Sequence, residues 1–96
     1  MTIKYHSEAR KEFFDTAAHY EDQVVGLGDE FIHEVEKVLD VIKQHPSAGT
    51  LITPNERRFL VCRFPYGIIY AEEDDLIKIF AIMDLRRKPN YWKSRR

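Results

Sequence analysis

The chain has 96 residues, of which 44% are hydrophobic and 32% charged, and no apolar run approaches the ~20 residues needed to cross a bilayer. We expect one domain over residues 1–96, because a chain of this size supports a single core. The lone Cys62 excludes an internal disulfide, no cysteine and histidine spacing suggests a zinc site, and the N-terminus lacks the apolar region of a signal peptide. These features predict a cytoplasmic protein with no cofactor and no metal.

The net charge of −1 conceals an uneven distribution. Residues 1–56 contain five Lys or Arg and eleven Asp or Glu, a balance of −6, whereas residues 57–96 contain ten and five, a balance of +5. The acidic residues are either a solvated helix surface or one side of a bipolar molecule. In the second case the basic side would bind an anionic or acidic ligand.

The first half of the chain predicts a short strand and two helices. Ile3 and Tyr5 alternate with polar residues, as in a strand, and Ser7 is the expected N-cap of the helix that follows. Apolar residues then recur at helical spacing on both sides of a break at residues 26–28, and the second run ends at His45 and Pro46. The first stripe is Ala9, Phe13, Ala17, Tyr20 and Val24, and the second is Leu27, Phe31, Val35, Val38 and Ile42, widened by Ile32 and Leu39. So short a link predicts an antiparallel helical hairpin.

The second half of the chain changes to a period of two. Residues 46–56 are expected to form a loop, and residues 58–64 a strand in which Cys62 is buried as a small hydrophobic residue. Further strands at 68–71 and 76–83 are separated by a polar turn at 72–75. The short connections predict a three-strand antiparallel meander. The helical hairpin would bury its stripes on one face of this sheet, which gives a two-layer α+β domain.

The tail after the last strand is basic and aromatic. Six of the last thirteen residues are Lys or Arg, and only one of them, Asp84, is acidic. The aromatic residues Tyr91 and Trp92 either stack on a base or fasten the tail to the domain. Because they follow Pro89 closely, we expect a final turn or short helix against the sheet. The predicted target-binding residues are Arg86, Arg87, Lys88, Tyr91 and Trp92.

No catalytic motif is evident from spacing alone, and a phosphate-binding glycine loop is among those missing. A ribonuclease would need a base for the 2′-hydroxyl, a cation for the phosphorane charge and an acid for the leaving oxygen. Asp84 is the candidate base, an arginine the candidate cation, and Tyr91 the candidate acid or stacking group. The candidate catalytic residues are Arg58, Arg63, Asp84, Arg86, Arg87 and Tyr91. In the alternative interpretation these arginines only pair with carboxylates of the helices or loops.

Several short segments, taken in order, match one known family. They are Ser7-Glu-Ala-Arg-Lys-Glu12, Tyr20, Leu27-Gly-Asp-Glu-Phe31, His45-Pro46, Arg58, Phe64-Pro-Tyr-Gly-Ile-Ile-Tyr70, Ile79-Phe-Ala-Ile-Met83 and Arg86-Arg-Lys-Pro-Asn-Tyr-Trp92. Over nearly its full length the chain resembles the RelE/ParE superfamily of type II toxin–antitoxin toxins, and within it the ParE-like plasmid-stabilisation branch. The resemblance implies a bacterial growth-inhibiting toxin, neutralised by a cognate antitoxin in a hetero-oligomer. Antitoxin segments often fold on binding, as a strand on a sheet edge or a helix in a groove.

The superfamily contains DNA gyrase poisons and ribosome-dependent mRNA endoribonucleases, also called mRNA interferases. In the endoribonucleases the middle strand often carries an arginine just before its apolar-apolar-Tyr end, and that position here is Gly67. Relatives with the same ending commonly have His in place of Asp84, which is only an acceptor when ionised and is expected to pair with Arg86 or Arg87. We therefore expect gyrase as the target ahead of ribosome-bound mRNA. A non-toxic, attenuated module that still binds its antitoxin is the third alternative.

Overall fold

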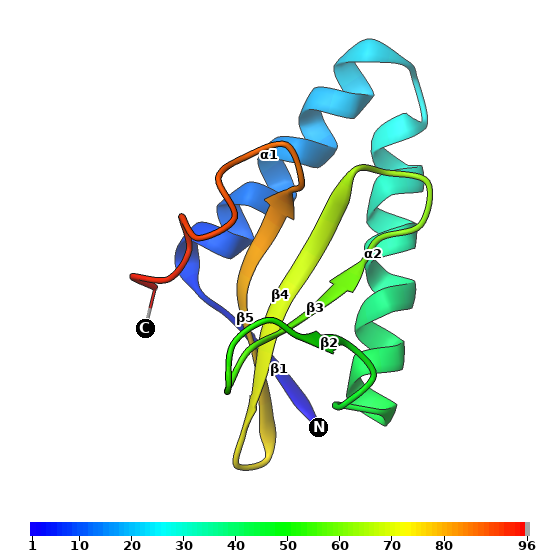
Figure 1. The fold of residues 1–96 in the computed structure, drawn as a ribbon. Coiled ribbons are helices and arrows are strands. Elements are labelled where there is room, and N and C mark those ends of the chain that lie inside the picture. The colour runs from blue at the N-terminus through cyan, green and yellow to red at the C-terminus, as the bar shows by residue number, and fades with distance from the viewer. Residues whose placement is uncertain (96) are drawn as a thin grey trace.

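The computed structural model describes residues 1–95, which form two helices and one five-stranded sheet (Figure 1). The elements are β1 (Thr2–Tyr5), α1 (Ser7–Gln23), α2 (Leu27–Gln44), β2 (Thr50–Leu51), β3 (Arg57–Leu60), β4 (Tyr66–Glu73) and β5 (Leu76–Asp84). The strand order is β1-β5-β4-β3-β2. β1 runs parallel to β5, and the other neighbouring strands are antiparallel. The predicted α+β architecture, with a helical hairpin and a meander of β3, β4 and β5, is confirmed.

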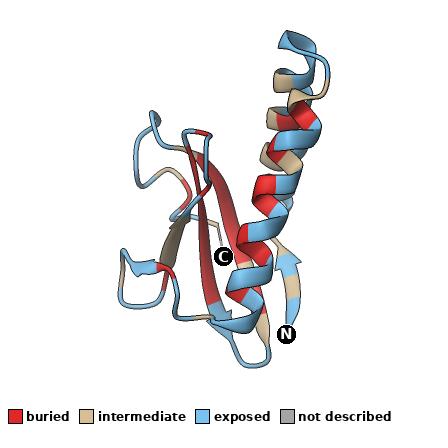
Figure 2. Cartoon of the chain, turned by 90° about the vertical axis from the view of Figure 1, so that its right-hand side faces the viewer, coloured by how far each residue is buried: buried red, intermediate tan, exposed pale blue. Residues whose placement is uncertain are grey.

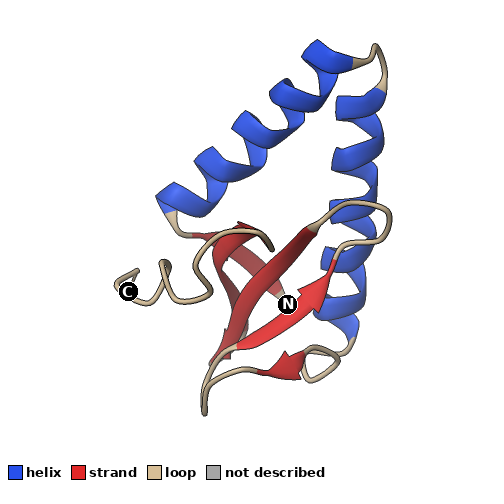
Figure 3. Cartoon of the chain, turned by 45° about the horizontal axis from the view of Figure 1, so that its top comes forward, coloured by secondary structure: helices blue, strands red, loops and turns tan. Residues whose placement is uncertain are grey.

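The two helices meet at a tight link and diverge from it towards the sheet (Figure 3). Gly26 has a φ of 90°, in the left-handed region that favours glycine. Gly28 is needed for a different reason, because a Cβ added there would lie 2.6 Å from the carbonyl oxygen of Ala17. The carboxylate of Glu21 accepts hydrogen bonds from the backbone N–H groups of both glycines. Neither helix has the length and apolar character of a membrane-spanning segment.

The main core lies between the helices and one face of the sheet. Figure 2 shows that the central strands are buried over most of their length, whereas α2 is buried on one side only. The buried residues of α1 are Ala9 and Ala17. Four aromatic rings meet in this core with centroid separations between 5.0 and 6.3 Å. They are Tyr20, Phe31, Phe64 and Tyr66. The predicted stripe of α2 is confirmed, since Phe31, Val35 and Ile42 are completely buried.

The opposite face of the sheet is covered by the tail. Successive strand residues point to opposite faces, so Ile68 packs in the helical core while Ile69 packs in a second cluster with Trp92. Trp92 is 2% exposed, and its Nε1 donates to the carbonyl oxygen of Pro89 at 2.8 Å. The described tail residues form turns rather than a helix. The expectation that the tail folds back as a turn is confirmed.

The N-terminal half departs from the predicted pattern in three places. His6, not Ser7, caps α1, since its Nδ1 accepts from the backbone N–H of Glu8 at 3.1 Å. Val24 lies past the end of α1 and is 58% exposed, so it is not part of the buried stripe. The expected loop at 46–56 contains the short strand β2, which is too brief to give a periodic signal.

The strand predicted over residues 58–64 is also shorter than expected. β3 ends at Leu60, and the chain reverses through Arg63 at a φ of 71°. Cys62 is therefore exposed, which corrects its predicted burial. The apparent period of two does not correspond to one buried face, because Leu60 and Cys62 are exposed whereas Phe64 is buried. The next strand, β4, starts at Tyr66 and extends to Glu73, so it takes in residues that were expected to lie in the flanking turns.

Candidate functional site

The tail is attached to the domain through one carboxylate, Glu12 of α1. Its Oε1 accepts from the backbone N–H of Ile82 at 3.1 Å and from Arg95 Nη1 at 2.9 Å. Its Oε2 accepts from the hydroxyl of Tyr91 at 2.8 Å and lies 3.6 Å from Arg87 Nη1. The side chain of Glu12 is only 15% exposed. The network therefore joins α1, β5 and the tail in a region largely shielded from water.

The same network seals one edge of the sheet. β1 pairs with β5 only as far as Ile79. Beyond that point, the N–H of Ile82 donates to Glu12 and the carbonyl of Phe80 accepts from Arg95 Nη1 at 3.0 Å. Side chains take the place of a neighbouring strand, so this part of the edge is closed to strand addition.

Tyr91 is held by the basic residues around it. The guanidinium carbons of Arg87 and Arg95 lie 3.8 and 4.9 Å from the centre of its ring. Burial, followed by the hydrogen bond to Glu12, raises the pKa of the Tyr91 hydroxyl above its ordinary value. The hydroxyl proton is thus donated to Glu12 and held tightly. This arrangement suits an anchoring role better than proton donation to a leaving group.

Asp84 pairs with Arg86, as the sequence predicted. Oδ1 of Asp84 accepts from the backbone N–H and from Nε of Arg86, and Oδ2 accepts from Nη2, each at 2.9 Å. The side-chain hydrogen bonds from Arg86 lower the pKa of Asp84 below its ordinary value. Asp84 is therefore a weak base whose two oxygens are already occupied.

The other predicted site residues lie in different surroundings. Arg63 donates to Glu30 of α2 at 2.7 Å and lies 3.7 Å from Glu34, so it turns towards the helices. Lys88 is exposed on the tail, whereas Trp92 belongs to the second core cluster. The six candidate catalytic residues are not gathered into one cluster. Their predicted roles remain predictions.

Arg58 lies in surroundings unlike those of the other candidate catalytic residues. It lies half-buried on β3, and its stem crosses Gly67, where an added Cβ would be 3.2 Å from Arg58 Cγ. Glycine at position 67 thus makes room for an arginine from the neighbouring strand. Among residues 1–95, the structure gives the Arg58 guanidinium group no hydrogen bond and no ion pair. It lines a hollow of about 230 Å³ on the tail side of the sheet, together with Ile52, Thr53, Ile69, Met83, Pro89, Asn90 and Trp92.

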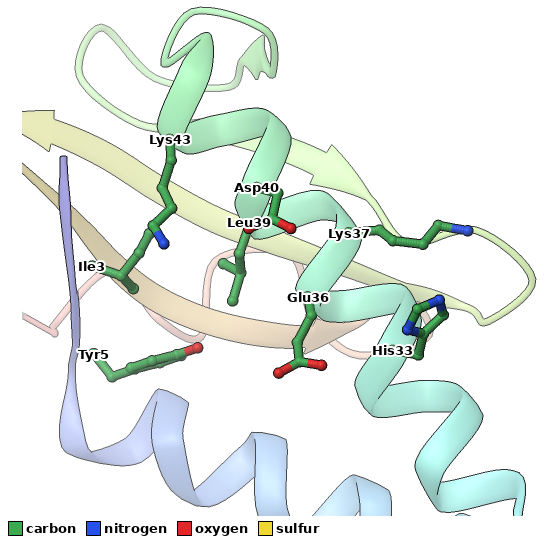
Figure 4. Close-up of a pocket in the computed structure, with 8 residues that line it drawn as sticks. All are labelled: Ile3, Tyr5, His33, Glu36, Lys37, Leu39, Asp40 and Lys43. Carbon is green, nitrogen blue, oxygen red and sulfur yellow. The ribbon is translucent and has the colours of Figure 1, made fainter.

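A larger hollow lies elsewhere, between β1 and α2, and has a volume of about 500 Å³ (Figure 4). Its lining residues are Ile3, Tyr5, His33, Glu36, Lys37, Leu39, Asp40 and Lys43. Burial raises the pKa of Tyr5, and the nearby Glu36 adds to this effect. None of the predicted site residues lines this hollow. Over residues 1–95, no group of three His, Cys, Asp or Glu side chains could hold a metal ion.

Sequence reasoning did not identify Glu12 and Arg95 as partners. Glu12 directly precedes Phe13 at the border of the apolar stripe of α1, which is the only local signal of its burial. Its partners Ile82 and Arg95 are 70 and 83 residues away in the chain. Only the folded sheet and the returning tail bring these groups together.

Comparisons with known proteins bear on the fold. A scan against protein-family models found no matching family, and a search of curated proteins found no match. Among solved structures, the chain matches one titled "Chromosomal ParDE TA system from P. aeruginosa", with a TM-score of 0.74 and 16% sequence identity. The match covers 90% of this chain and 97% of that chain. The chain therefore has the fold of a component of a ParDE toxin–antitoxin system, as its resemblance to the RelE/ParE superfamily implied.

Proposed function

We propose that this chain is the toxin of a type II toxin–antitoxin system, that a cognate antitoxin neutralises it, and that its target is DNA gyrase. The observation that carries the proposal is the fold shared with the ParDE system over 90% of the chain. Gyrase lies in the bacterial cytoplasm, so a cytoplasmic location is part of the proposal.

The choice of gyrase over mRNA rests on the groups that RNA cleavage would need. Position 67 carries glycine and supplies no cation. The oxygens of Asp84 are held by Arg86, and the Tyr91 hydroxyl donates to Glu12 with a raised pKa. A ribonuclease needs an acid and a base free to act at the same phosphate. These contacts favour binding of a target over cleavage of RNA.

A ribosome-dependent mRNA endoribonuclease is the second candidate, and one observation favours it. The stem of Arg58 crosses Gly67, so a cation reaches the tail side of the sheet from the neighbouring strand. In that case Arg58→Ala abolishes mRNA cleavage, and the exposed control Lys43→Ala retains it.

An attenuated antitoxin-binding module is the third candidate. Asp84 stands at the position where members of the resembling family commonly have His. Its carboxylate accepts hydrogen bonds from the guanidinium group of Arg86 and so occupies that group. Under this alternative Asp84→His raises toxicity. Equal toxicity of the two forms would show that Asp84 is not the residue that limits toxicity.

Induction of the chain in a bacterial host without an antitoxin separates the three candidates. The proposal expects growth to stop and a DNA-damage response to rise, because a poisoned gyrase leaves broken DNA. Rapid codon-specific mRNA cleavage with intact DNA contradicts it in favour of the ribonuclease. Normal growth at confirmed expression of the folded chain supports the attenuated module instead.

A further inference from the structure

The hollow of about 230 Å³ beside Arg58 is built from segments that are distant in the sequence. Arg58, Ile69 and Met83 line it from β3, β4 and β5. The other lining residues belong to the loop before β3 and to the tail, namely Ile52, Thr53, Pro89, Asn90 and Trp92. We call this site the Arg58 hollow. Because tail residues form part of its lining, the hollow exists only when the tail is folded against the sheet.

The stem of Arg58 is held by its packing on β4. Arg58 pairs with Ile69 in the antiparallel ladder, and its stem passes over Gly67. A Cβ added at Gly67 would lie 3.2 Å from Cγ and 3.3 Å from Cδ of Arg58, and 3.3 Å from Cδ2 of Leu85. Only glycine leaves the stem this path. The guanidinium group is therefore positioned before a partner arrives, which lowers the entropy cost of binding.

The guanidinium group of Arg58 is unpaired, unlike those of the other arginines in the predicted site. Arg63, Arg86 and Arg87 lie 2.7, 2.9 and 3.6 Å from a carboxylate oxygen. Arg58 is half-buried, and it has no hydrogen bond and no ion pair with any described residue. A charge that is partly removed from water without a partner is costly. This group therefore favours an anion from outside, and it can hold a carboxylate through two parallel hydrogen bonds.

The rest of the lining suits an anion that carries an apolar stem. The apolar lining residues are Ile52, Ile69, Met83, Pro89 and Trp92. The side-chain amide of Asn90, which has no hydrogen bond to a described residue, adds a second donor. Arg58 is the only cation among the described lining residues, whereas a nucleic acid strand is held by several cations along its phosphates. An Asp or Glu side chain, with one carboxylate on a short apolar stem, matches this lining better.

We propose that the Arg58 hollow binds an Asp or Glu side chain of the target protein, whose carboxylate pairs with the guanidinium group of Arg58. This inference rests on the proposed function and adds to it the chemistry of the partner surface. The hollow adjoins the predicted target-binding residues of the tail, since Trp92 lines it. The target surface thus continues from the tail onto the sheet, and Arg58 determines its specificity for an acidic residue.

Affinity for purified gyrase in the absence of DNA tests the proposal. Arg58→Gln should weaken binding by at least about tenfold, or 1.4 kcal/mol, and Arg58→Glu should weaken it further because two carboxylates repel. Arg10→Gln is the matched control, since Arg10 is exposed on α1 over the ring of Phe14 and should not affect affinity. Wild-type affinity in Arg58→Glu overturns the inference and leaves the proposed function standing. Failure of the wild-type chain to bind gyrase overturns the proposed function and this inference with it.

Two further variants separate recognition of the carboxylate from an effect on folding. Gly67→Ala keeps Arg58 but displaces its stem, so it should weaken gyrase binding although no charge is lost. Arg58→Lys keeps the charge but cannot form the two parallel hydrogen bonds, so its affinity should lie between those of wild type and Arg58→Gln. Thermal unfolding is measured for every variant. Affinity losses that follow the losses of thermal stability instead of this order overturn the inference.

A short single-stranded RNA is the second probe, because a guanidinium group also binds phosphate. The proposal expects the loss of affinity in Arg58→Gln to occur with gyrase and not with RNA. Lost RNA binding together with unchanged gyrase affinity would assign the hollow to a phosphate group and overturn the proposal.

Discussion

Glu12 is the residue on which the position of the tail depends. It accepts hydrogen bonds from the strand β5 and from the tail residues Tyr91 and Arg95. A carboxylate that is largely shielded from water is costly unless its oxygens are paired, and removing it leaves its partners unpaired. Glu12 therefore couples the stability of the tail to that of the helical layer.

Replacement of Glu12 tests this coupling. Glu12→Ala should lower the free energy of unfolding by about 3 kcal/mol, because Arg95 and the N–H of Ile82 lose their acceptor. The measurement is urea unfolding followed by the fluorescence of Trp92, the single tryptophan. Asp15→Ala is the control on the same helix, since its pair with Lys11 is exposed and should contribute less than about 1 kcal/mol. Equal effects of the two substitutions would rule out the anchoring role.

The Asp84–Arg86 pair predicts a pH dependence. The pKa of Asp84 is lower in the folded protein than its ordinary value of 3.8. The stabilisation is therefore present above the unfolded pKa and is lost as the pH falls through the folded one. Asp84→Asn should be less stable than wild type by about 0.5–1 kcal/mol at pH 7, because Arg86 is largely exposed. This difference should disappear towards pH 2, and a gap that is constant from pH 7 to pH 2 contradicts the assignment.

At the scale of elements, the link between the helices sets how closely α1 and α2 approach each other. Gly28→Ala should destabilise the protein by about 1–3 kcal/mol, because its Cβ would meet the backbone oxygen of Ala17 at 2.6 Å. Gly26→Ala meets no atom within 4 Å and is strained only by its φ of 90°, which costs about 1 kcal/mol. Thermal unfolding of the two variants compares the effects directly. A neutral Gly28→Ala would mean that the helices tolerate a wider separation.

The helices and the meander could be predicted because their signals are local. The apolar stripe of α2 repeats at helical spacing. β4 and β5 are long enough for their apolar runs to be recognised as strands. The end of β3 could not be predicted, because the run of mostly apolar residues at 59–64 resembles a strand although the chain reverses at Arg63. The parallel pairing of β1 with β5 joins residues more than seventy positions apart, and no local pattern encodes it.

The candidate site was predictable only in part, for the same reason. The pairing of Asp84 with Arg86 spans two residues and follows from the sequence. The partners of Arg63 and Tyr91 lie on distant helices, so their contacts with Glu30 and Glu12 required the fold. The position of Arg58 over Gly67 depends on the register between β3 and β4.

At the scale of the whole molecule, the two edges of the sheet are covered in different ways. The β5 edge is covered by β1, Glu12 and Arg95, whereas the outer edge of β3 continues beyond β2. The two faces are covered by the helices and by the tail. The tail, which carries the exposed Arg86 and Lys88, therefore forms the second covering layer of the sheet.

The most direct test of the central claim is a plasmid supercoiling assay with purified gyrase and the purified chain. The account predicts that the chain inhibits supercoiling, that cleaved plasmid accumulates, and that the antitoxin reverses both effects. Full gyrase activity in the presence of excess folded chain, with cleavage of ribosome-bound mRNA instead, would contradict it.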